Sequence, residues 1–266
     1  AGTDRLTFTL REAYGVTGHI IPWNYPLGIA CRTLAPALAA GNCCVLKPAE
    51  QAPLSSVRIA ELALEAGFPA GVLNVVPGYG AEAGAALSGH PGIDHISFTG
   101  SVPIGRKIAE AAAGNLIPAA LELGGKSPNI VLADADLDLA TPVVAQAILQ
   151  NAGQTCSAGA RLLVHRDVHD ELVARLKAIF ARTTIGAGSA DPDLGPVISA
   201  VQHQRIGELI DIGRGEAELV HGGNRPAGAQ YEAGYFFEPT LFDQVAPEAT
   251  IAQREIFGPV LTVTPF

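Results

Sequence analysis

The chain has 266 residues, of which 48% are hydrophobic and 16% charged, and its formal net charge at pH 7 is −9. This composition is typical of a globular protein with a large core and one or two domains, and it excludes an intrinsically disordered chain. The acidic balance and the lack of a Lys/Arg run exclude a nucleic-acid-binding surface, and no uninterrupted apolar stretch has membrane-spanning length.

The first half of the chain alternates short apolar strands with helices. Strands are expected at 15–21, 43–47, 72–76 and 93–98, and helices at 27–42, 52–69, 81–90 and 102–113. Pro36 is a weak point in the first of these helices. Alternation of this kind predicts a parallel sheet that is covered on both faces by helices.

The residue pattern of the sequence changes near Glu122, which predicts a second α/β lobe beginning near residue 125. Its expected elements are a strand and a helix within 127–153, a strand at 161–165, helices at 167–183 and 199–213, and strands within 217–223, 235–242 and 258–266. Asp167 is the expected N-cap of the helix at 167–183.

The four cysteines form no C-x-x-C pair, so neither a zinc site nor a thioredoxin-type motif is expected. We interpret Cys31, Cys43 and Cys44 as small core residues in a reducing compartment, and no signal peptide is visible, so a cytoplasmic protein is expected. The chain has no initiating Met and both of its ends look like strands, which predicts a piece of a longer protein.

Cys156 lies in a polar, glycine-containing turn, NAGQTCSAG. Most cysteines are buried and inert, whereas a reactive thiol needs partial exposure and polar neighbours, which this turn supplies. Glu122 in LELGG is either a solvated strand-end residue or a general base. The two glycines after Glu122 allow another backbone or a ligand to come close.

Two further segments have both a structural and a functional interpretation. Asn24 follows Trp23 between two prolines, so IIPWNYP is either a rigid turn with a core Trp or a stiff loop whose amide donates to an oxyanion. Lys47 and Glu50 follow a buried strand, so they are either a charged pair opening a helix or the contacts of a nucleotide ribose.

Glycine-containing turns follow two of the strands. GYGAEA, from Gly78, satisfies the pattern G-x-G-x-x-[GA], although a single match is a weak signal. FTGSVPIG, at 98–105, joins a strand to a helix N-terminus that could face a phosphate. His165 and His169 are four residues apart, but one ends a strand and the other begins a helix, so no metal site is expected.

PWNYP, KPAE, FTGS, LELGGKSPNIV, GQTCSAGARLLV and EIFGPV occur in the order and approximate spacing of the aldehyde dehydrogenase superfamily. The chain resembles this superfamily from about Thr7 to Phe266. The resemblance implies an α/β fold with a Rossmann-like parallel-sheet cofactor domain at 15–124, a catalytic α/β domain at 125–266 and a remnant of an oligomerisation strand at 1–14, truncated at both ends. It also implies a homo-oligomer, either a dimer or a tetramer.

The resemblance assigns roles to individual residues. Cys156 matches the nucleophile that attacks an aldehyde, Asn24 the oxyanion donor, and Glu122, 34 residues before Cys156, the base for thioester hydrolysis. The implied cofactor is NAD, with NADP as the alternative. The matching cofactor-binding residues are Trp23, Lys47, Glu50, Gly78, Gly100, Ser101, Ile104, Gly105, Glu255 and Phe257.

In this resemblance, Lys47 and Glu50 match the residues that contact the adenosine ribose, and Gly78 matches a residue near the adenine. Ser101, with Trp23 nearby, matches the region that holds the diphosphate. The family therefore holds the diphosphate at FTGS, and the G-x-G-x-x-A match is partly misleading. Glu255 and Phe257 fall beside the nicotinamide ribose and ring. Two alternatives stay open: a truncated chain that binds nucleotide without catalysis, and a relative that passes the thioester to coenzyme A. Glu122 argues against the second, since transfer to a thiol needs no base for water.

Overall fold

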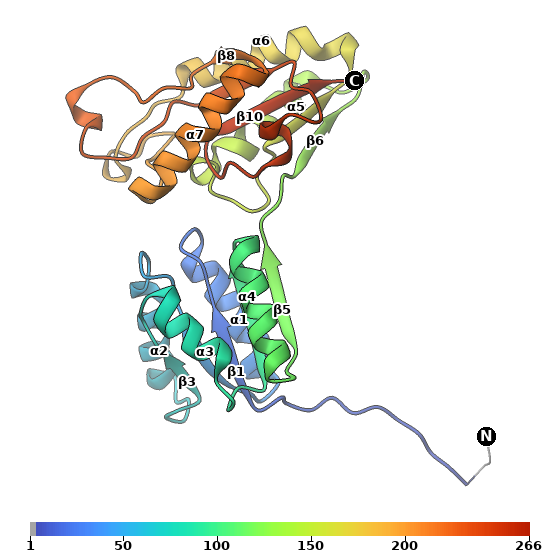
Figure 1. The fold of residues 1–266 in the computed structure, drawn as a ribbon, viewed down its shortest axis with the longest axis vertical. Helices are drawn as coiled ribbons and strands as arrows, with labels where there is room; N and C mark the ends of the chain where they lie inside the picture. Colours follow the sequence, from blue (N-terminus) through green and yellow to red (C-terminus); the bar gives the residue numbers. More distant parts are fainter. Residues whose placement is uncertain (1–3) are drawn as a thin grey trace. The chain divides into compact units, whose positions relative to one another are not determined.

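A computed structural model describes residues 4–266 of the chain, which divide into two compact units, Ala1–Leu123 and Gly124–Phe266 (Figure 1). Each unit is a layered α/β structure with its own sheet and core, as the sequence predicts. No helix in the described part of the chain is both long and apolar enough to cross a membrane.

Unit 1 contains a parallel sheet with the strand order β3-β2-β1-β4-β5. Its strands are β1 (Val16–Ile20), β2 (Cys43–Lys47), β3 (Leu73–Val75), β4 (His95–Gly100) and β5 (Ala119–Leu123). Its helices are α1 (Pro26–Ala39), α2 (Leu54–Glu65), α3 (Ala85–Gly89) and α4 (Val102–Gly114), with a π-helix, η1 (Gly80–Gly84), before α3.

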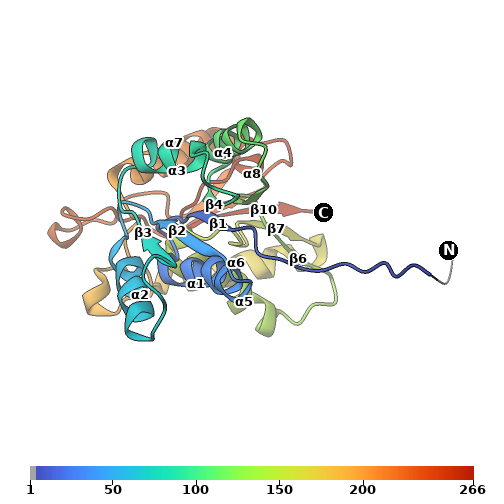
Figure 2. The same ribbon diagram turned by 90° about the horizontal axis from the view of Figure 1, so that it is seen from below.

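The two faces of this sheet are covered by different helix pairs. Helices α1 and α2 lie on one face and α3 and α4 on the other (Figure 2). One apolar cluster joins α1 to β2 through Leu34 and Leu46, and a second joins α4 to β4 through Ile108 and Phe98. Successive strands are added toward one edge of the sheet from β1 to β3 and toward the other edge from β4 to β5. The position between β1 and β4 is therefore the switch point at which open α/β sheets bind their ligands.

Unit 2 contains a mixed sheet with the order β6-β7-β10-β9-β8, in which only the pairing of β8 with β9 is antiparallel among the described strands. The strands are β6 (Pro128–Val131), β7 (Arg161–Val164), β8 (Glu218–His221), β9 (Thr240–Asp243) and β10 (Val260–Pro265). The helices are α5 (Leu137–Leu149), α6 (Arg166–Arg182), α7 (Ala200–Glu216) and α8 (Thr250–Gln253), with single 3-10 turns at η2 (Gln150–Gly153), η3 (Gly188–Ala190) and η4 (Ala229–Tyr231).

Two apolar clusters fill the layers of unit 2. Val144 and Leu172 place α5 and α6 against one face of the sheet, and Ile206 and Ile251 place α7 and α8 against the other. The helices are amphipathic, so burying their apolar stripes against the sheet supplies most of the stabilisation of the unit.

Three local predictions are corrected by the structure. Cys31 is exposed, because the buried face of α1 is made by Ile29, Ala30 and Leu34. The N-cap of α6 is His165, whose side chain accepts a hydrogen bond from the Asp167 amide. The strand expected within 235–242 begins only at Thr240, directly after Pro239, which has no N–H for a ladder. The helix expected at 27–42 does include Pro36, since α1 continues past it to Ala39.

The expected strand at Thr7–Leu10 does not form. Described residues 5–14 adopt no regular element and are exposed, since a strand needs a neighbour to complete its hydrogen bonds. Residues 1–3 of the same expected segment lie outside the described residues. Leu6, Phe8 and Leu10 are 86%, 66% and 69% exposed, and the expected oligomerisation role of this segment stays a prediction.

A buried histidine–aspartate contact joins α6 to β9. His169 is 6% exposed, with Nε2 2.8 Å from Asp243 Oδ1 and Nδ1 2.7 Å from Asp170 Oδ1. Burial alone would lower the pKa of His169, but the hydrogen bonds to Asp243 and Asp170 outweigh it, so the pKa lies above its usual value. The protonated histidine therefore stabilises the folded state.

We expect His169→Leu to destabilise the protein by about 2–3 kcal/mol at pH 6, because it removes the charged partner of the buried Asp243 carboxylate, which keeps the hydrogen bond from the Gln244 amide. The stabilisation from the raised pKa is complete below the unfolded-state pKa and is lost as pH rises through the folded-state pKa. The difference between wild type and variant in urea unfolding should therefore be smaller at pH 9. Asp170→Asn, at an exposed carboxylate, is the control and should change stability by less than about 1 kcal/mol. An equal loss at both pH values would contradict the prediction.

Candidate active site

The loop that carries Cys156 begins with a run of left-handed residues. Asn151, Ala152 and Gly153 have φ values of 51°, 54° and 71°, which end the helical turn η2 and reverse the chain. A non-glycine residue with positive φ is uncommon and costs free energy, and two in succession are typical of functional loops. Cys156 is exposed at the end of this turn.

Side-chain contacts fix the same loop. Gln154 is 4% exposed, its Nε2 donates to the Asn151 carbonyl at 3.0 Å, and its Oε1 accepts from the Ile198 amide at 2.9 Å. A Cβ on Gly153 would collide with the Gly258 carbonyl, so glycine is required there for both space and φ. Cys156 is therefore exposed on a loop whose preceding residues are fixed by these contacts, and this exposure agrees with its polar sequence context.

A second loop, residues 254–259, lies against the same region of unit 2. The Gly125 amide donates to Glu255 Oε1 at 3.2 Å, and a Cβ on Gly124 would collide with the same carboxylate. Arg205 Nη2 donates to the Glu255 carbonyl at 2.9 Å, and Gln202 Nε2 donates to the Phe257 carbonyl at 2.8 Å. The close approach that the glycine pair allows is thus made by Glu255.

The Glu255 carboxylate is half-buried, and its surroundings shift its pKa in opposite directions. Burial raises its pKa, whereas the Gly125 hydrogen bond and the positive charges of Arg205 and Lys126 lower it. The pKa of Glu255 lies above its ordinary value. Its backbone carbonyl and one carboxylate oxygen are fixed, which orients the side chain.

The predicted nucleotide contacts of unit 1 gather at one edge of its sheet. Asn24 follows β1, Lys47 ends β2, Gly100 ends β4, and Ser101 precedes the first turn of α4. The carboxyl ends of parallel strands lie at the same edge, so these residues come from separate parts of the chain to one place. Trp23, Gly78, Ile104 and Gly105 belong to the segments that follow the same strand ends.

Lys47 and Glu50 form a direct ion pair at this edge. Lys47 is 2% exposed, and its Nζ lies 3.3 Å from Glu50 Oε2. Ser101 occupies the N-cap position of the 13-residue helix α4, and its side chain makes no capping hydrogen bond. Gly78 precedes a π-helix and then only a 5-residue helix, so the G-x-G-x-x-A segment does not open a long helix.

Glu122 lies on β5 with the orientation expected from alternation. Leu121 and Leu123 pack against the core, while the Glu122 side chain is 65% exposed. Its Oε2 is 3.8 Å from Arg32 Nη2, which also donates to Thr99 Oγ1 at 3.4 Å. These groups line a pocket of about 480 Å³ formed by α1, β1, β4 and β5. Arg32 is a neighbour that sequence reasoning missed, because only folding places α1 beside β5.

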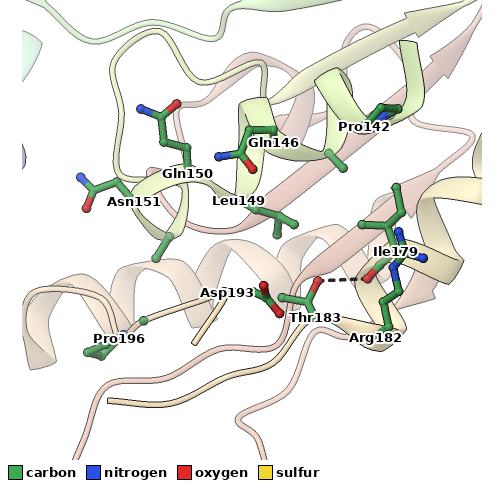
Figure 3. A pocket seen from close by; sticks show the side chains of 13 residues that line it. Pro142, Gln146, Leu149, Gln150, Asn151, Ile179, Arg182, Thr183, Asp193 and Pro196 are labelled. Atoms are coloured by element: carbon green, nitrogen blue, oxygen red, sulfur yellow. Dashed lines mark hydrogen bonds between the residues drawn. The ribbon is translucent and has the colours of Figure 1, made fainter. Parts of the chain in front are cut away.

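Unit 2 has a pocket of about 500 Å³ beside the turn η2 (Figure 3). Gln146 and Gln150, one helical turn apart, lie on one side, and Arg182, Thr183 and Asp193 lie opposite them. Gln150 and Asn151, which also line it, lie six and five residues before Cys156 in the sequence. None of these side chains belongs to a motif, so the sequence gave no sign of the pocket.

The sequence analysis also missed two cationic side chains of unit 2 that each have a buried nitrogen. Lys126 Nζ and Arg161 Nε are inaccessible to solvent, and neither atom has a hydrogen-bond partner. Within the described residues, no group of three His, Cys, Asp or Glu side chains could hold a metal ion. His165 caps α6 and His169 pairs with Asp243, so each has another role.

The chain is similar to known proteins over nearly all of its length. The chain is 49% identical over 98% of its length to a hydroxyisobutyraldehyde dehydrogenase of Mycolicibacterium austroafricanum, of which it covers 52%. It is 47% identical over 99% of its length to human retinal dehydrogenase 2, of which it covers 51%. It thus spans about half the length of these relatives.

A solved structure gives the same fold. The NAD+ complex of a Bacillus cereus aldehyde dehydrogenase matches 96% of this chain with a TM-score of 0.93 and 46% identity, and the match covers 52% of that protein. The model of the aldehyde dehydrogenase family matches residues 1–266. With the fold, the sequence and the family model in agreement over nearly every residue, the chain belongs to the aldehyde dehydrogenase family.

Proposed function

We propose that the protein oxidises an aldehyde to a carboxylic acid with NAD, through a thioester on Cys156. The observation that carries the proposal is the exposed thiol of Cys156 on a rigid, left-handed loop. Family membership and the NAD+ complex of the Bacillus cereus relative support it. The named relatives differ in their aldehydes, hydroxyisobutyraldehyde in one and retinal in another, so the proposal names the aldehyde class alone.

NAD fits the carboxyl edge of the unit 1 sheet. The switch point of the strand order between β1 and β4 supplies the place for the nucleotide. The buried Lys47 and its partner Glu50 supply polar groups for a ribose. The N-terminus of α4, behind Gly100 and Ser101, offers free amides for a diphosphate. The short, irregular elements after Gly78 favour this diphosphate position over the G-x-G-x-x-A segment.

The proposed chemistry has two stages. The Cys156 thiolate forms a bond to the aldehyde carbon, and the resulting oxyanion accepts hydrogen bonds from the Asn24 side chain and the Cys156 amide. NAD, when bound, accepts the hydride that leaves this carbon, which gives a thioester. Glu122 then takes a proton from water, the hydroxide adds to the thioester carbon, and the acid leaves as the Cys156 thiolate is released.

The exposed position of Glu122 suits the role of base. Its carboxylate is open to solvent, so water can reach it, and Arg32 Nη2 lies 3.8 Å from its Oε2. Transfer of the acyl group to coenzyme A would not need this base. Steady-state NADH formation that required coenzyme A would favour the acyl-transferring alternative, and an absence of NADH formation with NAD bound would favour a non-catalytic chain.

Glu122→Gln should give one burst of NADH per active site followed by slow turnover, since hydride transfer precedes hydrolysis. Rapid mixing with a simple aldehyde measures the burst and the steady rate in one experiment. Cys156→Ala is the matched control and should abolish both phases, because no thioester forms. Unchanged steady turnover in Glu122→Gln would remove Glu122 from the role of base.

Glu50 should make the protein prefer NAD to NADP. A carboxylate on the ribose accepts hydrogen bonds from both hydroxyls of NAD, whereas a 2′-phosphate meets a like charge at a cost of about 1–3 kcal/mol. Glu50→Gln should therefore raise kcat/KM for NADP relative to NAD, and Glu61→Gln, at an exposed carboxylate on α2, is the control. A wild-type kcat/KM ratio that favours NADP would contradict the assignment.

A further inference from the structure

Arg32 reaches the Glu122 carboxylate from a different secondary-structure element. Arg32 lies on α1 and Glu122 on β5, and Arg32 Nη2 is 3.8 Å from Glu122 Oε2. The two side chains are 54% and 65% exposed, so their ion pair adds little to the stability of the fold. The main consequence of this contact is therefore the placement of the carboxylate rather than a gain in folding free energy.

A hydrogen bond to β4 fixes the same guanidinium nitrogen. Arg32 Nη2 donates to Thr99 Oγ1 at 3.4 Å, and Thr99 is the register partner of Glu122 in the parallel pairing of β4 with β5. Register partners on adjacent strands point their side chains to the same face of the sheet. One nitrogen of Arg32 thus contacts two neighbouring positions on one face, and a strand residue sets its place relative to the carboxylate.

The neighbour of Arg32 in the sequence, Thr33, ties this turn of α1 to the sheet. Thr33 Oγ1 lies 2.6 Å from His19 Nδ1 on β1 and 3.2 Å from Ser97 Oγ on β4. His19 is 2% exposed, so the contact with its ring lies in the interior of unit 1. Thr33 therefore holds the helix backbone that carries Arg32 against two strands, which makes Arg32 a fixed support for a neighbouring side chain.

The Glu122 carboxylate needs such a support. Arg32, Thr99 and Glu122 line the pocket of about 480 Å³ in unit 1, and among the described residues that line it Arg32 is the only lysine or arginine. A largely exposed glutamate samples several rotamers, and only some of these point its carboxylate at a given water molecule. An ion pair with an anchored guanidinium reduces this sampling.

We propose that Arg32 is a positioning residue for Glu122: anchored on Thr99, its guanidinium holds the Glu122 carboxylate in the orientation in which it takes a proton from water, and so speeds hydrolysis of the thioester. The inference rests on the proposed function, in which Glu122 is the base. Arg32 itself makes and breaks no bond in the reaction. Hydride transfer precedes the action of Glu122, so it does not depend on Arg32.

The test measures the rate constant of thioester hydrolysis in the whole chain. NAD is supplied with the aldehyde that wild type oxidises fastest in a series of short aliphatic and aromatic aldehydes. The steady rate of NADH formation is divided by the fraction of Cys156 that carries the acyl group, which mass spectrometry of the quenched reaction gives. This ratio is the rate constant of hydrolysis whichever step limits turnover.

Arg32→Met should lower this rate constant about fivefold, the factor that corresponds to an exposed ion pair of about 1 kcal/mol. The acylated fraction of Cys156 should rise in the variant, because the thioester is formed at the same rate and removed more slowly. The rate of the first turnover, which ends at hydride transfer, should equal that of wild type. Arg32→Lys keeps a cation with N–H donors at this position and should recover most of the loss.

Two further variants and a melting curve separate positioning from other effects. In a Glu122→Gln background, Arg32→Met should have no further effect, because the group through which it acts is gone. Arg58→Met is the matched control, since it removes an exposed arginine whose ion-pair partners, Glu61 and Glu65, lie on the same helix α2, and it should leave hydrolysis unchanged. Arg32→Met should melt within a few degrees of wild type, as expected for the loss of an exposed ion pair.

The results that would overturn the inference are distinguishable. If Glu122→Gln slowed hydrolysis and Arg32→Met did not, the inference alone would fail. Equal slowing by Arg32→Met in the wild-type and Glu122→Gln backgrounds would show that Arg32 acts independently of Glu122. If Glu122→Gln left the rate constant of hydrolysis unchanged, or if wild type oxidised none of the aldehydes, the proposed function would fail and the inference with it.

Discussion

The hydrogen bond from the Gly125 amide to the Glu255 carboxylate joins segments 130 residues apart, and the geometry of unit 2 around Cys156 depends on it. It fixes the loop at 254–259, whose Gly258 carbonyl lies against Gly153. Gly153 in turn allows the left-handed turn that precedes Cys156. Two glycines at these contacts, Gly124 and Gly153, let the carboxylate and the backbone approach where a Cβ would collide. The thiol and the carboxylate are therefore placed by one continuous set of contacts.

Much of this arrangement could be predicted from the sequence. Period-two apolar strands and the helices between them specify parallel sheets, and the glycine pair after Glu122 correctly indicated a close approach. Alternation also placed Leu121 and Leu123 in the core and Glu122 outside. These predictions succeed because each depends on a local period or on a missing side chain, both of which are visible in a few consecutive residues.

The neighbours of the site could not be predicted in the same way. Arg32 reaches Glu122 only because β1 and α1 lie beside β4 and β5, and Arg161 faces Lys126 only because β6 pairs with β7. The left-handed conformations of Asn151 and Ala152 follow from packing against a loop more than 100 residues later, and alanine has no intrinsic preference for them. Long-range contacts of this kind have no local signal.

The two buried lysines illustrate how one residue type can serve different purposes. Lys47 is buried at the end of β2 with a direct carboxylate partner, Glu50, at 3.3 Å, so the pair compensates for its own desolvation. Lys126 has no such partner at its Nζ, and its pKa is lowered to about 7. Lys126 therefore gains or loses its proton near neutral pH, because burial and the Arg161 charge outweigh the attraction of the Glu255 carboxylate.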